Sequence, residues 1–211
     1  MLERTEDRKV QAVTGRRRLV SCSAQGCGGS LVVFLAICLL LCATHAEVFA
    51  QSDSLRLIDA VRQQQSEVVR SLLPVSDVNA IQPDGATAVH WAAYQDDPEM
   101  VRLLVGAGAD PDVANELGVT PLVLACANGN PIIVKLLLDA GAEADVAVGT
   151  GETALMGCAR TGNPDAVAAL VAANADVNAR EPVEQQTALM WAVAHSHTEV
   201  ARFLLESGAD V

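Results

Sequence analysis

Along residues 53–211, short apolar stretches alternate with polar breaks in a regular order. One kind of stretch, of which TALMWAV is an example, is rich in alanine, whose small side chain lets a neighbouring helix approach closely. The other kind carries a run of larger apolar residues such as Val101, Leu103 and Leu104. The order predicts pairs of short helices, the first lined with alanine and the second with larger apolar residues.

The same order recurs at a nearly fixed period. The residues Thr87, Thr120, Thr153 and Thr187 open the alanine-rich stretches and are separated by 33, 33 and 34 residues. The second stretches begin from equivalent places at 96, 129, 162 and 196, and a weaker copy precedes them from residue 55. Self-similarity at such a period is the signature of a repeat architecture, in which each unit packs only against its neighbours.

Residue types at the unit ends support these helix boundaries. Asp or Asn followed by Pro precedes three of the second stretches, at 97–98, 130–131 and 163–164. Asp and Asn cap helix N-termini, and Pro suits the first helical position because the N–H that it lacks has no partner there. We expect the second helices to end at residues that tolerate a left-handed conformation, namely Gly108, Gly141, Asn174 and Gly208. Tight turns between units are expected at Gly85, Gly118 and Gly151.

This arrangement resembles the ankyrin repeat, whose pattern runs G-x-T-P-L-H-x-A-A, then G-H-x-E-V-V-x-L-L-L, then G-A-D-V-N. Residues 118–122 and 208–211 match it almost letter for letter. The resemblance implies an all-α ankyrin-repeat solenoid of five helix-turn-helix units over residues 51–211, the last one incomplete. The units span about 53–83, 84–116, 117–149, 150–183 and 184–211.

The chain departs from the family pattern in three places. The motif His survives only as His90 and the motif Pro only as Pro121, and the turn at 178–186 has one extra residue and lacks the glycine. These losses remove local hydrogen bonds and rigidity, so we expect a stack that is less stable than an idealised one. We expect the fold itself to be unchanged.

A different kind of segment precedes the repeats. Residues 31–43 are thirteen uncharged and mainly apolar positions, preceded by Arg16–Arg18. This stretch is shorter than the roughly 20 residues that a membrane span needs, and it fits the apolar core of a secretory signal. We therefore predict a signal peptide over residues 1–50, cleaved after Ala50, and an exported protein that is periplasmic or secreted. The alternatives are a translation start downstream of Met1, a twin-arginine signal, or an uncleaved signal anchor with the repeats facing outward.

Charge is concentrated in the repeats. Residues 51–211 carry 8 of the 14 basic side chains and 22 of the 26 Asp and Glu side chains, a net charge of −14. Such a surface repels phosphate backbones, so nucleic-acid binding is disfavoured, and a protein with a basic face is the expected partner. Self-repulsion favours a soluble monomer. Four of the six cysteines precede residue 51, which excludes a disulfide-dense scaffold.

Few residues suggest chemistry. His195 and His197 would need a third ligand to hold a metal, and the repeat register explains the glycines at 149–151 without a phosphate loop. Cys126 and Cys158 are interpreted as small buried side chains and not as a bridge, because helices 8–10 Å apart exceed the Cα separation that a disulfide allows. We therefore predict no catalytic residues, no metal and no cofactor. A non-enzymatic binding protein is the expected class, with an enzyme of unrecognised site as the minor alternative.

By the resemblance, the concave strip of turn tips and first-helix ends recognises other proteins. The residues expected there are Asp84, Tyr94, Gln95, Glu116, Asn128, Glu152, Arg160, Thr161, Glu184 and His195. The acidic tip residues among them would form a ridge that suits a basic partner. Trp91 and Trp191 share one repeat position, which indicates packing.

The end of the chain raises a second hypothesis. Phe203, Leu204 and Leu205 are expected to lie uncovered by any further repeat. The repeats would then be a regulatory or accessory domain of a larger exported protein, or the last face would bind something.

Overall fold

The computed structural model describes residues 54–211, and the predicted signal peptide and its cleavage site lie outside this part. Residues 54–62 are helical. The helices that follow are α2 (Ser66–Leu72), α3 (Ala88–Tyr94), α4 (Pro98–Gly106), α5 (Pro121–Asn128), α6 (Pro131–Asp139), α7 (Ala154–Thr161), α8 (Pro164–Ala172), α9 (Ala188–Ala194) and α10 (Thr198–Glu206). Within this part there is no strand, only an isolated bridge between Ala147 and Thr153.

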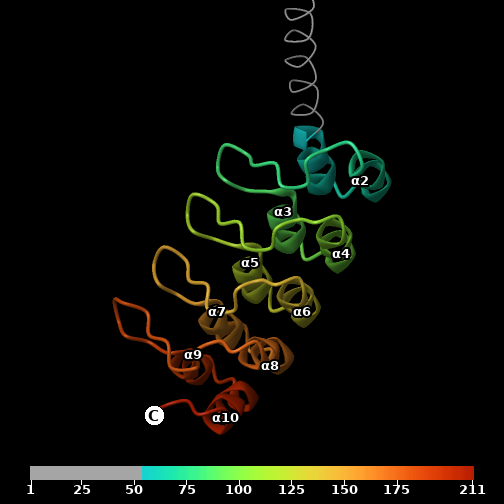
Figure 1. Cartoon of the computed structure of the whole chain (residues 1–211). Coiled ribbons are helices and arrows are strands. Elements are labelled where there is room, and N and C mark those ends of the chain that lie inside the picture. Colours follow the sequence, from blue (N-terminus) through green and yellow to red (C-terminus); the bar gives the residue numbers. More distant parts are fainter. Residues whose placement is uncertain (1–53) are drawn as a thin grey trace, which may run out of the picture. The chain divides into compact units, whose positions relative to one another are not determined.

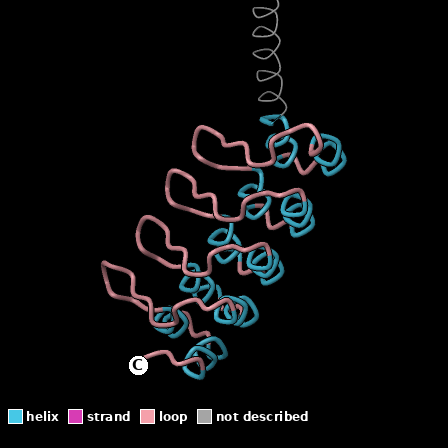
Figure 2. Tube along the Cα trace, viewed as in Figure 1, coloured by secondary structure: helices cyan, strands magenta, loops and turns pink. Residues whose placement is uncertain are grey.

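The helices form antiparallel pairs that stack side by side (Figure 1). The first helices α3, α5, α7 and α9 make one row, and the second helices α4, α6, α8 and α10 make another beside it. Long hairpin loops project from the same side of every pair (Figure 2). The predicted all-α repeat solenoid is confirmed, and none of these helices is long and apolar enough to cross a membrane.

The recurring threonine begins each first helix. The Oγ1 atoms of Thr153 and Thr187 accept the backbone N–H three residues later at 3.3 Å. In the second unit the threonine works with His90, whose Nδ1 accepts the Thr87 N–H at 3.1 Å. In the fourth unit the sulfur of Met156 takes that place, with the Thr153 N–H 3.5 Å away. Thioether sulfur is a weak acceptor, so the departure from the motif weakens this contact without removing it.

The second helices begin as predicted. The carboxylate of Asp97 accepts the Met100 N–H at 3.0 Å, and the side chains of Asn130 and Asn163 cap α6 and α8 in the same way. Pro occupies the first helical position in all three helices. These bonds satisfy N–H groups that a helix start leaves unpaired.

The predicted left-handed residues also stand where expected. Gly108, Gly141 and Gly208 have φ values of 90°, 100° and 94°, and Asn174 has 66°. At Gly85, the φ of 82° is accompanied by a close approach of the next hairpin. A Cβ built there would lie 2.8 Å from the Cα of Asn115, so a larger residue would push the two hairpins apart.

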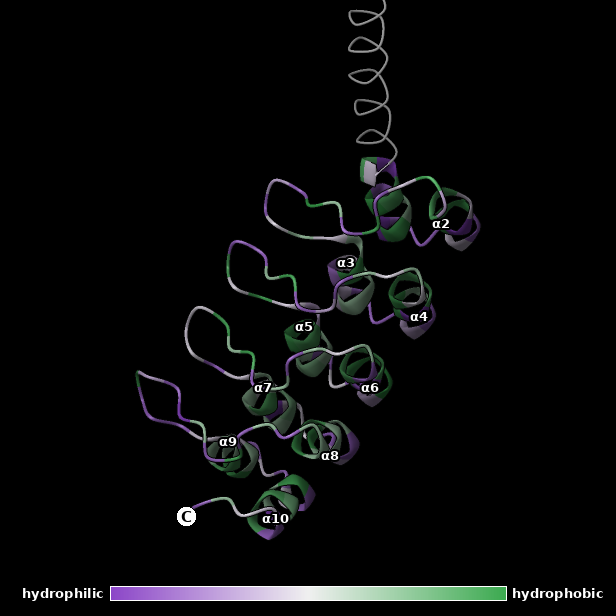
Figure 3. Cartoon of the chain, in the orientation of Figure 1, coloured by the Kyte–Doolittle hydropathy of each residue, from purple (hydrophilic) through white to green (hydrophobic). Residues whose placement is uncertain are grey.

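A single apolar core runs through the stack. The alanines of the first helices are almost fully buried, among them Ala88, Ala92, Ala125, Ala154 and Ala192. Larger residues of the second helices belong to the same core. Figure 3 shows hydrophobic residues in both rows of helices. Leu204 belongs to this core and is fully buried, so the expectation that it lies uncovered is wrong. The large apolar side chains that do remain exposed at the last unit are Met190, Val193, Leu205 and the final residue, Val211.

Neighbouring units are joined by a ladder of polar contacts. The amide of Asn79 donates to the Gly108 carbonyl at 3.1 Å, and the side-chain oxygen of Asn79 accepts the Asp110 N–H at 2.7 Å. Asn178 repeats both bonds with Gly208 and Asp210 near the other end. These bonds fix the spacing of the units and therefore the shape of the surface that they present.

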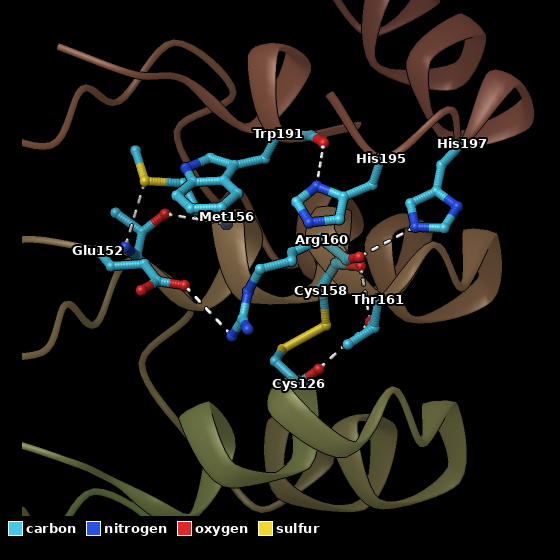
Figure 4. Close-up of polar contacts among 10 residues, drawn as sticks. Cys126, Glu152, Met156, Cys158, Arg160, Thr161, Trp191, His195 and His197 are labelled. Carbon is cyan, nitrogen blue, oxygen red and sulfur yellow. Dashed lines mark hydrogen bonds and ion pairs between the residues drawn. A yellow bond between two sulfur atoms is a disulfide. The ribbon is translucent and has the colours of Figure 1, made fainter. Parts of the chain in front are cut away.

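The prediction that Cys126 and Cys158 stay unbridged is wrong. The two residues form a disulfide between α5 and α7, with their Cα atoms 4.4 Å apart (Figure 4). The axis-to-axis distance used in the prediction overstates the gap, because Cα atoms on facing sides lie about 2.3 Å closer to the partner than each axis does. A Cβ built at Gly157 would lie 3.6 Å from the Cβ of Cys126, an ordinary van der Waals distance, so the close approach does not depend on this glycine.

Candidate protein-interaction surface

The hairpin tips carry both acidic and apolar exposed residues. Asp84, Glu116 and Glu184 are exposed at three of the tips. Next to them Ile81, Leu117 and Val183 are 61%, 75% and 81% exposed, unusually high values for large apolar side chains. Main-chain bonds hold successive hairpins in place, for instance from the Glu116 N–H to the Asp84 carbonyl at 3.0 Å. The tips therefore form a supported edge with negative charge and apolar contact area together.

The ten predicted site residues all lie on the hairpins or at the ends of first helices. Asp84, Tyr94, Glu116, Asn128, Glu184 and His195 are exposed, whereas Gln95, Glu152, Arg160 and Thr161 are half-buried. Glu152 is the exception among the acidic tip residues, because its carboxylate turns inward and pairs with Arg160 at 3.6 Å. The acidic edge therefore consists of three exposed carboxylates and one paired one.

Three of the predicted residues bind neighbouring repeats. The Gln95 amide donates to the Arg62 carbonyl at 2.8 Å, and the Asn128 amide donates to the Ala93 carbonyl at 2.9 Å. The Thr161 hydroxyl lies 2.9 Å from the Cys158 carbonyl and 3.3 Å from the Cys126 carbonyl. Their polar groups hydrogen-bond neighbouring units of the repeat. These residues therefore hold the surface in shape and leave few free donors for a partner.

Aromatic residues gather at the second unit. Tyr94 is 63% exposed and meets Trp91 edge to face, with ring centroids 6.1 Å apart. The guanidinium of Arg62 lies 4.5 Å from the Trp91 ring, and the Trp91 Nε1–H donates to Gln82 at 2.8 Å. A hollow of about 240 Å³ opens beside them, lined in part by Asp84. Trp91 therefore packs, as predicted, and also borders the surface.

The last unit places a different set around Trp191 (Figure 4). His195 stacks on the indole at a centroid distance of 5.7 Å, and its Nδ1–H donates to the Trp191 carbonyl at 3.0 Å. The Arg160 guanidinium lies 6.0 Å from the same ring, and the His197 Nε2–H donates to the Arg160 carbonyl at 2.9 Å. The indole Nε1–H is buried and has no acceptor within residues 54–211.

Glu181 is a site residue that sequence reasoning missed. The residue as a whole is 9% exposed, and its carboxylate accepts the backbone N–H groups of Val183, Glu184 and Gln186 at 2.7, 2.6 and 3.0 Å. The Gln186 N–H contributes most to lowering the pKa of this carboxyl, and the other two N–H groups act in the same direction. The sequence signal for Glu181 is the extra residue in this turn, because the backbone N–H groups of the longer turn need a side-chain acceptor.

The surroundings of His90 favour its neutral imidazole. Burial lowers the pKa of its imidazole, against the smaller opposing effects of the Val119 carbonyl and Asp84. The Nε2 atom lies 3.0 Å from the Val119 carbonyl, and Nδ1 accepts the Thr87 N–H. The neutral tautomer protonated on Nε2 fits both bonds. His90 thus links its own helix start to the next unit.

Metal-binding groups do not converge in the described part of the chain. His195 and His197 stack at a centroid distance of 6.1 Å, but no group of three or more His, Cys, Asp or Glu side chains there could hold a metal ion. The prediction that no cofactor is bound stays a prediction.

Similar proteins match single segments of the chain. Regulatory protein NPR6 from Arabidopsis thaliana is 45% identical over 73 residues, which are 33% of this chain and 16% of that protein. The ankyrin repeat and LEM domain-containing protein 1 homolog from Caenorhabditis elegans is 45% identical over 53 residues, 25% of this chain and 8% of that protein. The BTB/POZ domain and ankyrin repeat-containing protein NOOT2 from Medicago truncatula is 44% identical over 73 residues, 33% and 15% respectively. The chain thus matches less than a fifth of the length of each relative.

The family model covers far more of the chain. The model of ankyrin repeats, which represents three copies, matches residues 57–148 and 133–211. These matches include every helix pair from α3 to α10, together with the threonine-capped first helices and the Asn- or Asp-capped second helices described above. The chain belongs to the ankyrin-repeat family.

Proposed function

We propose that this protein is an exported ankyrin module that binds another protein through its hairpin tips and first-helix ends. Ankyrin repeats mediate protein–protein interaction and are typically non-enzymatic. The observation that carries the proposal is the supported edge of exposed residues, where Asp84, Glu116 and Glu184 alternate with Ile81, Leu117 and Val183. Exposed apolar area supplies affinity, and carboxylates around it select a partner with a basic face.

Export is supported by two independent features of the chain. The first is the apolar segment at 31–43 with basic residues before it. The second is the disulfide between Cys126 and Cys158, since disulfides persist in oxidising compartments such as the periplasm and the extracellular space. The signal-anchored arrangement, with the repeats facing outward, is the alternative and makes the same binding surface available.

A second candidate function is that of a regulatory domain within a larger protein. The names of two relatives place ankyrin repeats beside a LEM or a BTB/POZ domain, and a third is named a regulatory protein. The exposed Met190, Val193 and Leu205 favour this candidate, because a further domain could cover them. Its test is binding of the exposed face to a domain encoded next to the repeats.

The experiment is capture of partners from the native compartment with the whole chain, followed by measurement of Kd for the identified protein. The triple variant D84N/E116Q/E184Q removes the exposed tip charges. The variant E67Q/D139N/E206Q removes three exposed charges from second helices and serves as the charge-matched control. We expect the tip variant to weaken binding about tenfold or more and to reduce its salt dependence, with little change for the control. Equal effects of both variants, or binding that is insensitive to salt, would contradict the proposal.

A further inference from the structure

A hollow of about 240 Å³ opens between the first two hairpins and the first helices α3 and α5. Trp91, Tyr94 and Leu124 contribute apolar side chains to its walls, and Asp84 contributes a carboxylate. We call these four residues and the space between them the Trp91 hollow. Its volume is below the about 300–1,000 Å³ of small-molecule sites, so it suits a single side chain better than a whole ligand.

The aromatic walls of the Trp91 hollow are held in place before any partner binds. The Trp91 Nε1–H donates to Gln82 at 2.8 Å, and the Arg62 guanidinium lies 4.5 Å from the Trp91 ring. The Tyr94 ring meets Trp91 edge to face, while 63% of Tyr94 stays exposed. Walls that are already ordered lower the entropy cost of binding. Trp, Tyr and Arg are also the residue types that most often dominate the energy of an interface.

The neutral polar side chains around the hollow already have partners within the chain. His90 uses both ring nitrogens, one with the Thr87 N–H and the other with the Val119 carbonyl. The side-chain oxygen of Asn115 accepts the N–H groups of Leu117 and Val119 at 3.0 and 2.9 Å. An apolar side chain can therefore enter the hollow without leaving these groups unpaired, and its burial against the walls is favourable.

The rim of the hollow is negative. The Asp84 carboxylate accepts the Ala86 N–H at 3.1 Å and forms no ion pair in the described part of the chain. Glu116 stands exposed at the neighbouring tip, where its N–H donates to the Asp84 carbonyl at 3.0 Å. The guanidinium at the Trp91 ring, that of Arg62, is paired with Asp59 at 3.7 Å. The net negative charge at the rim therefore favours a basic residue of a partner beside the apolar one.

The aromatic pair is specific to one unit among the four that begin with threonine. The residues at the two equivalent positions are Trp91 and Tyr94 in the second unit, Leu124 and Ala127 in the third, Gly157 and Arg160 in the fourth, and Trp191 and Ala194 in the fifth. The repeat itself therefore does not require two aromatic residues at these positions.

We infer that the Trp91 hollow seats a large apolar side chain of the protein partner, one that stands next to a lysine or arginine in the partner's sequence. The apolar side chain packs on Trp91, Tyr94 and Leu124, and the neighbouring basic side chain pairs with Asp84. The contact combines the two properties of the hairpin edge, apolar area for affinity and carboxylates for selection. This inference rests on the proposed function and assigns one contact within it.

The first test observes the Leu124 methyl resonances, which L124I assigns, in ¹³C-methyl-labelled protein expressed from the whole chain. The probe is acetyl-Lys-Phe-Lys-amide, whose phenyl ring shifts the resonances of the protons that it packs against. One control peptide, acetyl-Lys-Ala-Lys-amide, lacks the large apolar side chain, and another, acetyl-Gln-Phe-Gln-amide, lacks the charge.

We expect the probe to shift the Leu124 resonances with a Kd of about 1–10 mM, the affinity that one buried side chain and one exposed ion pair allow. The alanine peptide should give no saturable shift, and the glutamine peptide should bind about threefold more weakly than the probe. The methyl resonances of Ile132, in the second-helix row, should stay unchanged. No saturable shift at Leu124 with the probe, a saturable shift there with the alanine peptide, or equal Kd values for the probe and the glutamine peptide would overturn the inference.

Two variants test the two parts of the contact. Y94A removes an aromatic wall that is mostly exposed, so the fold should persist, which thermal unfolding checks. It should weaken the binding of the probe and of the glutamine peptide alike, by about fivefold. D84N should weaken the binding of the probe alone, by about threefold. The matched controls I132A and D139N, at exposed positions of α6, should leave both affinities unchanged. Unchanged affinity in Y94A, or equal weakening of both peptides in D84N, would contradict the assignment.

The last test uses the captured partner and separates this inference from the proposed function. We expect Y94A to raise the Kd of the complex about tenfold, because aromatic residues at such hollows are typical of the few that dominate an interface. Substitution by alanine of the partner's residue that packs on Tyr94 should have a similar effect, and the two changes together should cost less than the product of the single effects. Independent effects of the two changes would count against the assignment.

The failures are distinguishable. If the tip variant D84N/E116Q/E184Q weakens the complex but Y94A leaves its Kd unchanged, only the assignment of the Trp91 hollow is wrong. If no protein partner binds the tips at all, the proposed function is wrong whatever the peptides do.

Discussion

The second and fifth units place a tryptophan at the same repeat position, yet the two side chains have different surroundings. Trp91 is fixed by a hydrogen bond to Gln82 and lies under Arg62 and beside Tyr94. Among residues 54–211 the Trp191 Nε1–H has no acceptor, and the Trp191 ring lies beside His195 and lines a hollow with Glu152, Glu181 and Glu184. The repeat fixes where the ring stands, whereas the hairpin before it decides how firmly the ring is held. Equivalent positions in a repeat protein therefore need not have equivalent roles.

The largest expected effect tests whether the disulfide stabilises the fifth-unit end of the stack more than the second-unit end. The double variant C126A/C158A removes a bridge that joins residues 32 apart in the sequence, and we expect it to lower the free energy of unfolding by about 2–4 kcal/mol. Denaturant titration gives the total loss. Hydrogen exchange should show that protection falls most in α5 to α10 and least in α3 and α4. A uniform loss of protection along the stack would show that the disulfide stabilises both ends equally.

The second-largest expected effect concerns His90 and Met190, which stand three positions after the threonines Thr87 and Thr187. His90 is 3% exposed and hydrogen-bonds both Thr87 and Val119, whereas Met190 in the fifth unit is 47% exposed. We expect H90A to cost about 2 kcal/mol, because it leaves buried partners unpaired, and M190A to change stability by less than about 0.5 kcal/mol. Thermal or denaturant unfolding measures both. Similar losses in the two variants would mean that the capping histidine contributes nothing beyond packing.

His90 also gives the second unit a dependence on pH. Burial lowers the pKa of His90 below its ordinary value of 6.5, so the folded state prefers the neutral imidazole. Its contribution to stability is present above pH 6.5 and is lost as the pH falls from there through the lowered pKa. Glu181 also has a lowered pKa, and its contribution is lost as the pH falls below its ordinary value of 4.5. Unfolding curves of wild type and H90M between pH 7.5 and 5 should converge toward low pH, and parallel curves would refute this assignment.

The smallest expected effect comes from a variant that makes the surroundings of Trp91 in the second unit resemble those of Trp191 in the fifth. Q82A removes the acceptor of the Trp91 Nε1–H and should cost about 1 kcal/mol. The Trp91 indole proton should then exchange with solvent about as fast as that of Trp191, which NMR measures directly. The charge-neutral change Q186A, in the fourth hairpin, is the control and should leave the Trp91 proton unaffected. Unchanged exchange in Q82A would show that the bond to Gln82 does not hold the ring.

The sequence was sufficient for the fold because its signals are local and repeated. Asp97, Asn130 and Asn163 each act within one helix turn, so their caps follow from residue type alone. The disulfide was missed because it depends on how closely two helices approach at one point, which the spacing of repeats does not specify. Leu204 was misplaced for a related reason, since its burial depends on the packing of α10 against the preceding pair.

The candidate site was only partly predictable. The register placed all ten predicted residues on one edge, but it could not show that Gln95, Asn128 and Thr161 bond to the preceding unit. Glu181 could not be found by register at all, because it lies in the turn whose length departs from the repeat. Side-chain roles at this surface depend on contacts between units, and those contacts appear only after the units are stacked.

The bridge between Cys126 and Cys158 has a mechanical consequence. A force applied to the two ends of the oxidised chain bypasses the segment enclosed by the bridge, because tension runs across the sulfur atoms. Its 32-residue separation corresponds to roughly 110 Å of contour length that stays hidden during extension. Reduction would release this length, so a stretched molecule would report its redox state as a change in its final extension.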